Sequence, residues 1–128
     1  MDIESDGSRI FVRVDRGEDV VATVRLAVER LDLSAAVVTS GVGMVQAAEL
    51  GSAAGGGKRS FPGLLDLSSL SGSVLRRHGT QVARLQAVLN DARNRTVGGR
   101  LIAARCHGVV GVLLAAVDLS MDVSEPPR

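Results

Sequence analysis

Three stretches in the middle of this chain decide its fold. They read LLDLSSLSGS (64–73), VARLQAVL (82–89) and TVGGRL (96–101). Residues 82–89 follow the period of two typical of a β-strand, so Arg84 and Gln86 share one face while the opposite face is wholly apolar. Gly98 and Gly99 let the backbone turn tightly or approach a neighbour closely just before Arg100. A strand, a turn and a second strand would therefore gather Arg84, Gln86 and Arg100 into one cluster, the candidate site of function.

Length and composition predict a single domain. The chain has 128 residues, of which 45% are hydrophobic, and this suffices for one core. The formal net charge is +1, so no strong field favours nucleic acid or an anionic membrane as a partner. Only 2% of the residues are aromatic, which leaves almost no platform for stacking single-stranded bases.

The sequence shows no sign of export or membrane insertion. Met1–Asp6 is acidic and lacks the apolar core of a signal peptide. The longest apolar run, Val109–Val117, is far shorter than the roughly 20 residues of a membrane-spanning helix. Cys106 stands alone, so neither an intrachain disulfide nor a cysteine-based metal site can form. We therefore expect a cytoplasmic protein without a membrane partner.

Hydrophobic periodicity predicts one α+β domain. Apolar residues recur at helical spacing from Val20 to Leu31, behind Glu18 and Asp19, whose charges suit the positive end of a helix dipole. Apolar runs predict strands at residues 9–14, 35–38, 45–50, 64–75, 82–89, 97–104 and 109–117. The expected fold is a mainly antiparallel sheet with one or two packed helices. It would occupy residues 9–119, between a flexible N-terminus at 1–8 and a flexible tail at 120–128.

Glycine-rich and polar segments are expected to form turns and loops. Ser40–Gly43 lacks the third glycine of a dinucleotide-binding loop, so we interpret it as a tight turn between strands. Gly72 is expected to interrupt the strand at 64–75. Arg76–Gly79 is predicted to be an exposed turn, and Asn90–Asn94 a hairpin loop.

Four short motifs, in this order, resemble the plant-and-prokaryote-conserved (PPC, also PCC) domain family. They are Gly17-Glu18-Asp19 ahead of the helix, Thr39–Gly43, Leu70–Gly72 and the pair Gly98-Gly99. The resemblance covers roughly residues 9–117, most of the chain. It implies a PPC-like fold that assembles as a homotrimer, with sites between subunits.

The resemblance also points to what this chain lacks. Many prokaryotic PPC members carry a His-x-His on the strand and a third histidine after the Gly-Gly pair, which together resemble a zinc site. Here those positions hold Arg84, Gln86 and Arg100. A guanidinium stays protonated and cannot ligate a metal, so we expect a metal-free protein without a cofactor.

Plant members, which also lack the histidines, contact DNA through a separate element that resembles an Arg-Gly-Arg-Pro hook. The nearest segment, Gly57–Ser60, lacks the second Gly-Arg and the proline, so direct DNA binding is not expected.

Arg84, Gln86 and Arg100 are the candidate ligand-binding residues. Two guanidiniums and an amide would repel a divalent metal and attract a carboxylate, phosphate or enolate oxygen. The alternative is that both arginines form structural ion pairs with Asp66, Glu49 or a neighbouring subunit.

His78 and Asp91 are the candidate catalytic residues. His78 would act as a general base if its loop folds over the cluster, and Asp91 is an alternative acid or base in the hairpin loop. The competing interpretation is that both are solvated loop side chains.

Three classes of function remain open at this point. The first is a homotrimer whose arginine-lined pocket between subunits binds a small anionic organic molecule, with metal-free acid/base chemistry such as cyclisation, isomerisation or hydrolysis as an extension. The second is a non-catalytic protein-interaction or transcription-associated regulatory module. The third is a divergent family member that kept only the scaffold.

Overall fold

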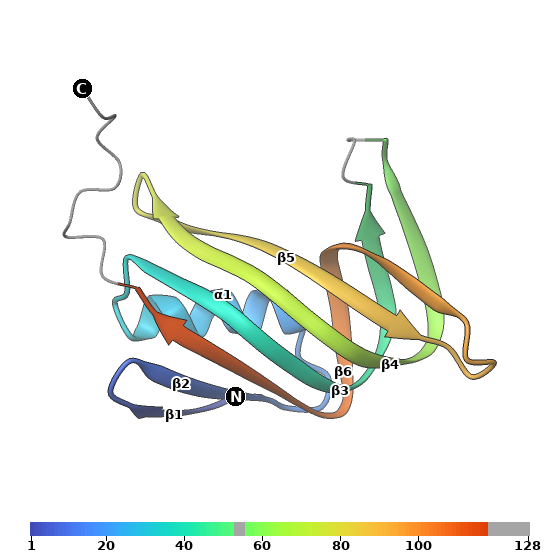
Figure 1. The fold of residues 1–128 in the computed structure, drawn as a ribbon, viewed down its shortest axis with the longest axis horizontal. Coiled ribbons are helices and arrows are strands. Elements are labelled where there is room, and N and C mark those ends of the chain that lie inside the picture. The colour runs from blue at the N-terminus through green and yellow to red at the C-terminus, as the bar shows by residue number, and fades with distance from the viewer. Residues whose placement is uncertain (53–55, 118–128) are drawn as a thin grey trace.

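The computed structural model describes residues 1–52 and 56–117, which form one helix and a six-stranded sheet. The helix is α1 (Val20–Arg30). The strands are β1 (Asp2–Asp6), β2 (Arg9–Val14), β3 (Ala35–Gly51), β4 (Lys58–Arg77), β5 (Thr80–Asn90) and β6 (Thr96–Ala116). All pairings are antiparallel, in the order β1-β2-β6-β3-β4-β5. The predicted mainly antiparallel sheet with a packed helix is confirmed (Figure 1).

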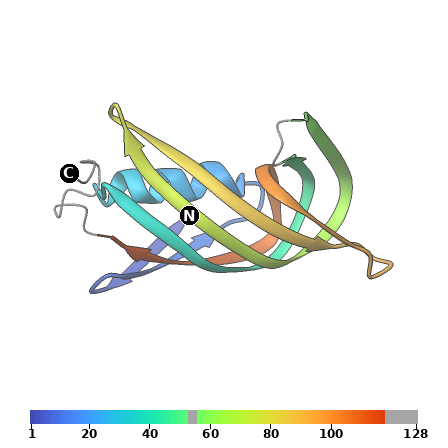
Figure 2. The same cartoon turned by 45° about the horizontal axis from the view of Figure 1, so that its top comes forward.

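An additional pairing between β5 and β6 closes one end of the sheet. There β3 pairs with β4, β4 with β5, β5 with β6, and β6 again with β3. To take part in both the open and the closed region, β3, β4 and β6 are 17, 20 and 21 residues long and strongly curved (Figures 1 and 2). Shifts of register along β3 and β6 supply the bends, as β-bulges generally do.

The helix α1 packs within the curve of the sheet, where it contacts β2, β5 and β6 (Figure 2). Its buried side chains recur with the helical period: Val20, Thr23, Val24, Ala27 and Val28. Asp19 caps the helix, because its Oδ2 accepts a hydrogen bond from the Ala22 N–H at 2.8 Å. Its Oδ1 accepts another from the Ala104 N–H of β6, also at 2.8 Å. One carboxylate therefore both starts the helix and fastens it to the sheet.

The prediction of a turn at Ser40–Gly43 is wrong, because this segment lies inside the continuous strand β3. Gly43 has a φ of 141°, and an added Cβ would overlap the carbonyl oxygen of Val109 on β6. The glycine is needed where the two backbones approach closely, and not for a turn. With no loop at this point, a phosphate-binding role for the segment has no structural basis.

The interruption expected at Gly72 is also wrong, since this residue lies inside β4. Of the two roles expected for Gly98-Gly99, a tight turn or a close approach to a neighbour, the structure shows the close approach, because both glycines lie inside β6. An added Cβ at Gly99 would lie 3.0 Å from the carbonyl oxygen of Gly51. The glycine pair therefore allows β6 to approach β3 at the closed end of the sheet.

The prediction of a flexible N-terminus at residues 1–8 is also corrected by the structure. Residues 2–6 form β1, which pairs with β2 in a register from Asp2 opposite Arg13 to Asp6 opposite Arg9. Met1 and Ile3 are partly buried against the hydrophobic core. These two apolar side chains anchor a segment that is otherwise polar. The tail expected at 120–128, like the end of the expected domain at residue 119, lies outside the described residues.

Candidate functional site

The structure brings Gln86 and Arg100 side by side, with Arg84 on the same face. Gln86 of β5 is the register partner of Arg100 of β6, and directly opposed residues of an antiparallel pair hold their Cβ atoms about 5 Å apart. Arg84 precedes Gln86 by one full pleat, so its side chain emerges on the same side. The β5–β6 hairpin creates this arrangement, and its loop follows β5 where the sequence predicted one, at Asn90–Asn94. We call Arg84, Gln86 and Arg100 the arginine cluster.

The arginine cluster is exposed and carries uncompensated positive charge. Among the described residues, no carboxylate lies within salt-bridge distance of Arg84 or Arg100. Glu49, one of the expected partners, is held instead by Lys58 at 3.2 Å. Asp66 stands opposite Asn90, four residues along β5 from Gln86 and so about 13 Å away. The ion pairs with Asp66 or Glu49 that the alternative interpretation offered are thus not formed, and its third partner, a neighbouring subunit, stays open.

Gly51 is a part of the site that the sequence did not reveal. It is the register partner of Arg100 on the side away from β5, and an added Cβ there would lie 2.8 Å from Nη2 and 3.2 Å from Nε of Arg100. The guanidinium therefore rests against bare backbone. No local pattern in the sequence indicates this contact. It follows from the pairing of Gly51 with Arg100, which depends on the long-range register of β3 and β6.

Serine hydroxyls border the arginine cluster on its other side. Ser71 of β4 is the register partner of Gln86, and Ser73 is the partner of Arg84. Both side chains therefore share the face of the cluster. Hydroxyls, an amide and guanidiniums side by side make a surface rich in hydrogen-bond donors, which suits an oxyanion.

His78 does not join the arginine cluster within one chain. It lies at the tip of the β4–β5 hairpin, where His78 (φ 53°) and Gly79 (φ 80°) form the turn. Gln86 is six residues beyond Thr80 along β5, a separation of about 20 Å at the rise of a strand. Within one chain, this loop does not fold over the cluster, which was the condition for His78 to act there as a general base.

Asp91 also has a structural role that occupies its carboxylate. Its Oδ1 accepts hydrogen bonds from the N–H groups of Arg93 and Arg95, and its Oδ2 accepts one from Nε of Arg95, all at 2.9 Å. The hydrogen bond from the Arg95 backbone is the largest cause of a lowered pKa of Asp91. A carboxylate stabilised in its charged form is a weak base, so Asp91 holds the β5–β6 loop in place and is poorly suited to acid/base catalysis.

Replacement of Asp91 by asparagine should change the pH dependence of stability. Because the pKa is lowered by folding, the ionised carboxylate stabilises the native state above its unfolded pKa of about 4, and this stabilisation disappears as the pH falls through the lower folded pKa. We expect Asp91→Asn to unfold more easily at pH 7 and to lose less stability than the wild type as the pH falls below about 4. Urea denaturation across this range measures both effects. Identical acid profiles for the two proteins would contradict the assignment.

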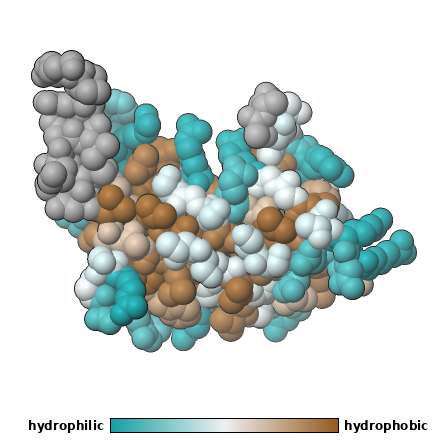
Figure 3. Space-filling view, viewed as in Figure 1, coloured by the Kyte–Doolittle hydropathy of each residue, from teal (hydrophilic) through white to brown (hydrophobic). Residues whose placement is uncertain are grey.

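An apolar surface lies on the face of the sheet that points away from α1. Ile10, Val12 and Val14 of β2 are buried toward the helix, so Phe11 between them points outward. Phe11 is opposite Leu113 of β6, and both are exposed. Other exposed apolar side chains on strands include Val37, Val42, Met44, Leu64 and Val109. Figure 3 shows hydrophobic residues gathered over the middle of the molecule, with hydrophilic groups around its edges.

None of the better-formed pockets of the described residues is lined by Arg84, Gln86 or Arg100. The arginine cluster lies on an open sheet face, which a second molecule would have to cover to form a pocket.

No group of three or more His, Cys, Asp or Glu residues in the described part of the chain could hold a metal ion. Within residues 1–52 and 56–117, no helix has the length and apolar character needed to cross a membrane.

Comparison with known proteins identifies the family. The model of the Plants and Prokaryotes Conserved (PCC) domain matches residues 1–118. The chain therefore belongs to the PCC domain family, as its motifs indicated. No curated protein matches it by sequence at a significant level.

Solved structures share the fold at low sequence identity. A plant- and prokaryote-conserved protein from Pyrococcus horikoshii is 16% identical, with a TM-score of 0.78 over 91% of this chain and 82% of that one. A protein from Bacteroides thetaiotaomicron, provisionally named as DNA-binding, is 12% identical, with a TM-score of 0.85 over 91% and 84%. A metal-containing protein from Archaeoglobus fulgidus is 24% identical, with a TM-score of 0.75 over 91% and 85%.

Proposed function

We propose that this PCC-domain protein is a homotrimer in which the arginine cluster, covered by a neighbouring subunit, binds a small anionic organic molecule. The observation that carries the proposal is the register of Gln86 against Arg100, beside Arg84, with no carboxylate of the described residues within salt-bridge distance of either guanidinium. Charge-assisted hydrogen bonds to an oxyanion would satisfy them. The resemblance to PPC domains supplies the expectation of three subunits with sites between them.

The proposal is for binding and not for catalysis. Both candidate catalytic groups, His78 and Asp91, lie away from the arginine cluster in the chain, and Asp91 is occupied by hydrogen bonds within its own loop. Cyclisation, isomerisation or hydrolysis would need an acid or base next to the ligand. Such chemistry would therefore depend on a group supplied by another subunit.

A regulatory module that acts with DNA or protein partners is the second candidate. It is favoured by the provisional DNA-binding names of similar structures from Bacteroides thetaiotaomicron and Ralstonia eutropha. The net charge of +1 argues against strong non-specific binding to duplex DNA. A titration with duplex DNA at low salt separates the two proposals, since the first predicts no saturable binding.

The proposed assembly leads to a prediction at the outward apolar face. Leu113 is 46% exposed beside Phe11, and we propose that a second copy covers it. Leu113→Lys should convert a trimer into monomers, because an ammonium buried in an apolar contact is strongly disfavoured. Arg9→Lys, at an exposed position of the same sheet, is the matched control and should remain trimeric. Light scattering that shows a wild-type monomer at all concentrations would contradict the trimer.

A further inference from the structure

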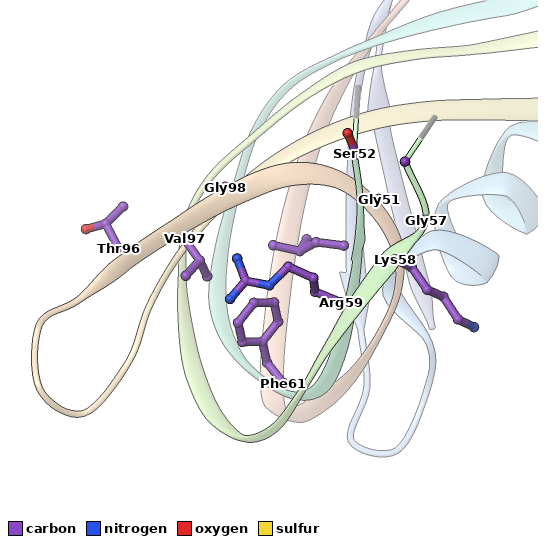
Figure 4. A pocket seen from close by; sticks show the side chains of 11 residues that line it. Gly51, Ser52, Gly57, Lys58, Arg59, Phe61, Thr96, Val97 and Gly98 are labelled. Atoms are coloured by element: carbon purple, nitrogen blue, oxygen red, sulfur yellow. The ribbon is translucent and has the colours of Figure 1, made fainter. Parts of the chain in front are cut away.

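A pocket of about 450 Å³ opens at the closed end of the sheet, on the side opposite the arginine cluster. Its walls come from the end of β3, the start of β4 and the start of β6 (Figure 4). Small-molecule sites in proteins typically measure roughly 300–1,000 Å³. The pocket is therefore large enough for a ligand of one or two rings.

The pocket has an apolar floor made by Leu50, Phe61 and Val97. Leu50 is only 5% exposed, and its register partners are Arg59 on β4 and Leu101 on β6. Phe61 pairs with the buried Ala48 two residues earlier on β3. The side chains of this floor thus continue the inner face of the sheet, and a ligand on it would extend the hydrophobic core.

Arg59 provides a positive charge above this floor. Its guanidinium carbon lies 5.2 Å from the centroid of the Phe61 ring, so the group is held by a cation–π contact. Figure 4 shows Arg59 over Phe61 and directed toward Val97, whereas Lys58 points away and is bound to Glu49 at 3.2 Å. Among the described residues, no carboxylate lies within salt-bridge distance of Arg59, and no Asp or Glu lines the pocket.

We propose that this pocket binds a small anion with a flat apolar body, such as an aryl carboxylate or aryl sulfonate. The ring would lie on Leu50, Phe61 and Val97, and the anionic group would receive charge-assisted hydrogen bonds from Arg59. Stacking on Phe61 leaves the N–H groups at the edge of the planar guanidinium free to donate. The site does not rest on the arginine cluster, because Arg100 contacts Gly51 on the opposite face of β3.

The test uses anilinonaphthalene sulfonate, an aryl sulfonate whose fluorescence rises in apolar surroundings. The chain contains no Trp or Tyr, so protein fluorescence does not interfere. We expect saturable binding to the wild type, weakened by about 10-fold in Arg59→Gln through loss of one charge-assisted contact. Arg93→Ala removes a guanidinium from the exposed β5–β6 loop, away from both the pocket and the arginine cluster, and should bind the dye within about twofold of the wild type. The uncharged phenylnaphthylamine should bind the wild type and Arg59→Gln equally, because it lacks the group that Arg59 contacts.

Two results with variants would overturn the proposal. One is equal affinity of the sulfonate for the wild type and Arg59→Gln, with melting curves showing both folded. The other is loss of dye binding in Leu113→Ser, which would place the dye on the outward apolar face. Amide chemical shifts give an independent readout that does not depend on any variant. Under the proposal, the dye perturbs Leu50, Val97 and Gly98 of the wild type and leaves Leu113 unchanged, and the opposite pattern refutes it.

Discussion

Replacement of Gly72 by alanine is expected to cost more than about 4 kcal/mol of the free energy of unfolding, or to prevent folding altogether. Gly72 has a φ of 137°, a backbone conformation that residues with a Cβ rarely adopt. An added Cβ would also overlap the carbonyl oxygen of Arg84 and lie 3.0 Å from the Cα of Leu85. Both atoms belong to the backbone of β5, so a change of side-chain rotamer cannot relieve the overlap.

The same strand offers a matched control. Gly63 also lies in β4, but an added Cβ would meet no atom within 4 Å, and its φ is not positive. Gly63→Ala should therefore change the free energy of unfolding by no more than about 1 kcal/mol. The change is stabilising if the reduced conformational entropy of the unfolded chain is the main effect. Chemical denaturation of the two variants measures the difference. Equal stabilities would show that the approach of β4 to β5 at Gly72 can relax.

The Gly72 result also bears on the arginine cluster. Gly72 is the register partner of Leu85, between Arg84 and Gln86. Its missing side chain allows β5 to lie close to β4 and so fixes where the two polar side chains emerge. This gives a physical reason for the glycine of Leu70–Gly72, one of the four motifs on which the resemblance to the family was based.

Local periodicity was sufficient to predict the faces of the strands but not their lengths. The alternation in residues 82–89 predicted that Arg84 and Gln86 share a face, and β5 has this geometry. By contrast, the strands expected at 97–104 and 109–117 are one strand, β6. A long bent strand contains glycines and shifts of register that resemble turns in the sequence. Only pairing with β3 shows that the chain continues in the same direction.

Long-range register explains most of what the sequence could not predict about the site. The neighbours Gly51, Ser71 and Ser73 come from β3 and β4, and their pairing with the cluster depends on bulges far away along the strands. The pocket under Arg59 was missed for a similar reason. Gly57–Ser60 was compared only with a DNA-binding hook, whose second Gly-Arg and proline it lacks, and residues 58–60 belong to β4. The contact of Arg59 with the Phe61 ring was not predicted.

Replacement of Arg100 by alanine is expected to weaken binding of the anionic ligand by about 10–100-fold, equivalent to about 1.4–3 kcal/mol. Its stability without ligand should change by less than about 0.5 kcal/mol, because Arg100 is exposed and no carboxylate of the described residues pairs with it. If Arg100 instead neutralised a buried carboxylate of a neighbouring subunit, the variant would lose about 3–5 kcal/mol of stability. A ligand-binding role therefore predicts a large loss of affinity and a small loss of stability, whereas a structural role predicts a large loss of stability.

Arg93→Ala is the matched control for charge. Arg93 is exposed in the β5–β6 loop, and its backbone N–H, not its guanidinium, bonds to Asp91. The variant removes the same charge from the chain as Arg100→Ala but leaves the arginine cluster intact. It should bind an anion as the wild type does.

The most direct test of the anion site is calorimetric melting of the wild type, Arg100→Ala and Arg93→Ala with and without phosphate, malonate or citrate. At a ligand concentration of 100 times the dissociation constant, binding adds about 2.7 kcal/mol to the stability of the folded state. The account predicts that at least one of these anions raises the melting temperature of the wild type and Arg93→Ala and has little effect on Arg100→Ala. No shift in the wild type, together with a much lower melting temperature of Arg100→Ala, would contradict it and make the arginine cluster part of the scaffold.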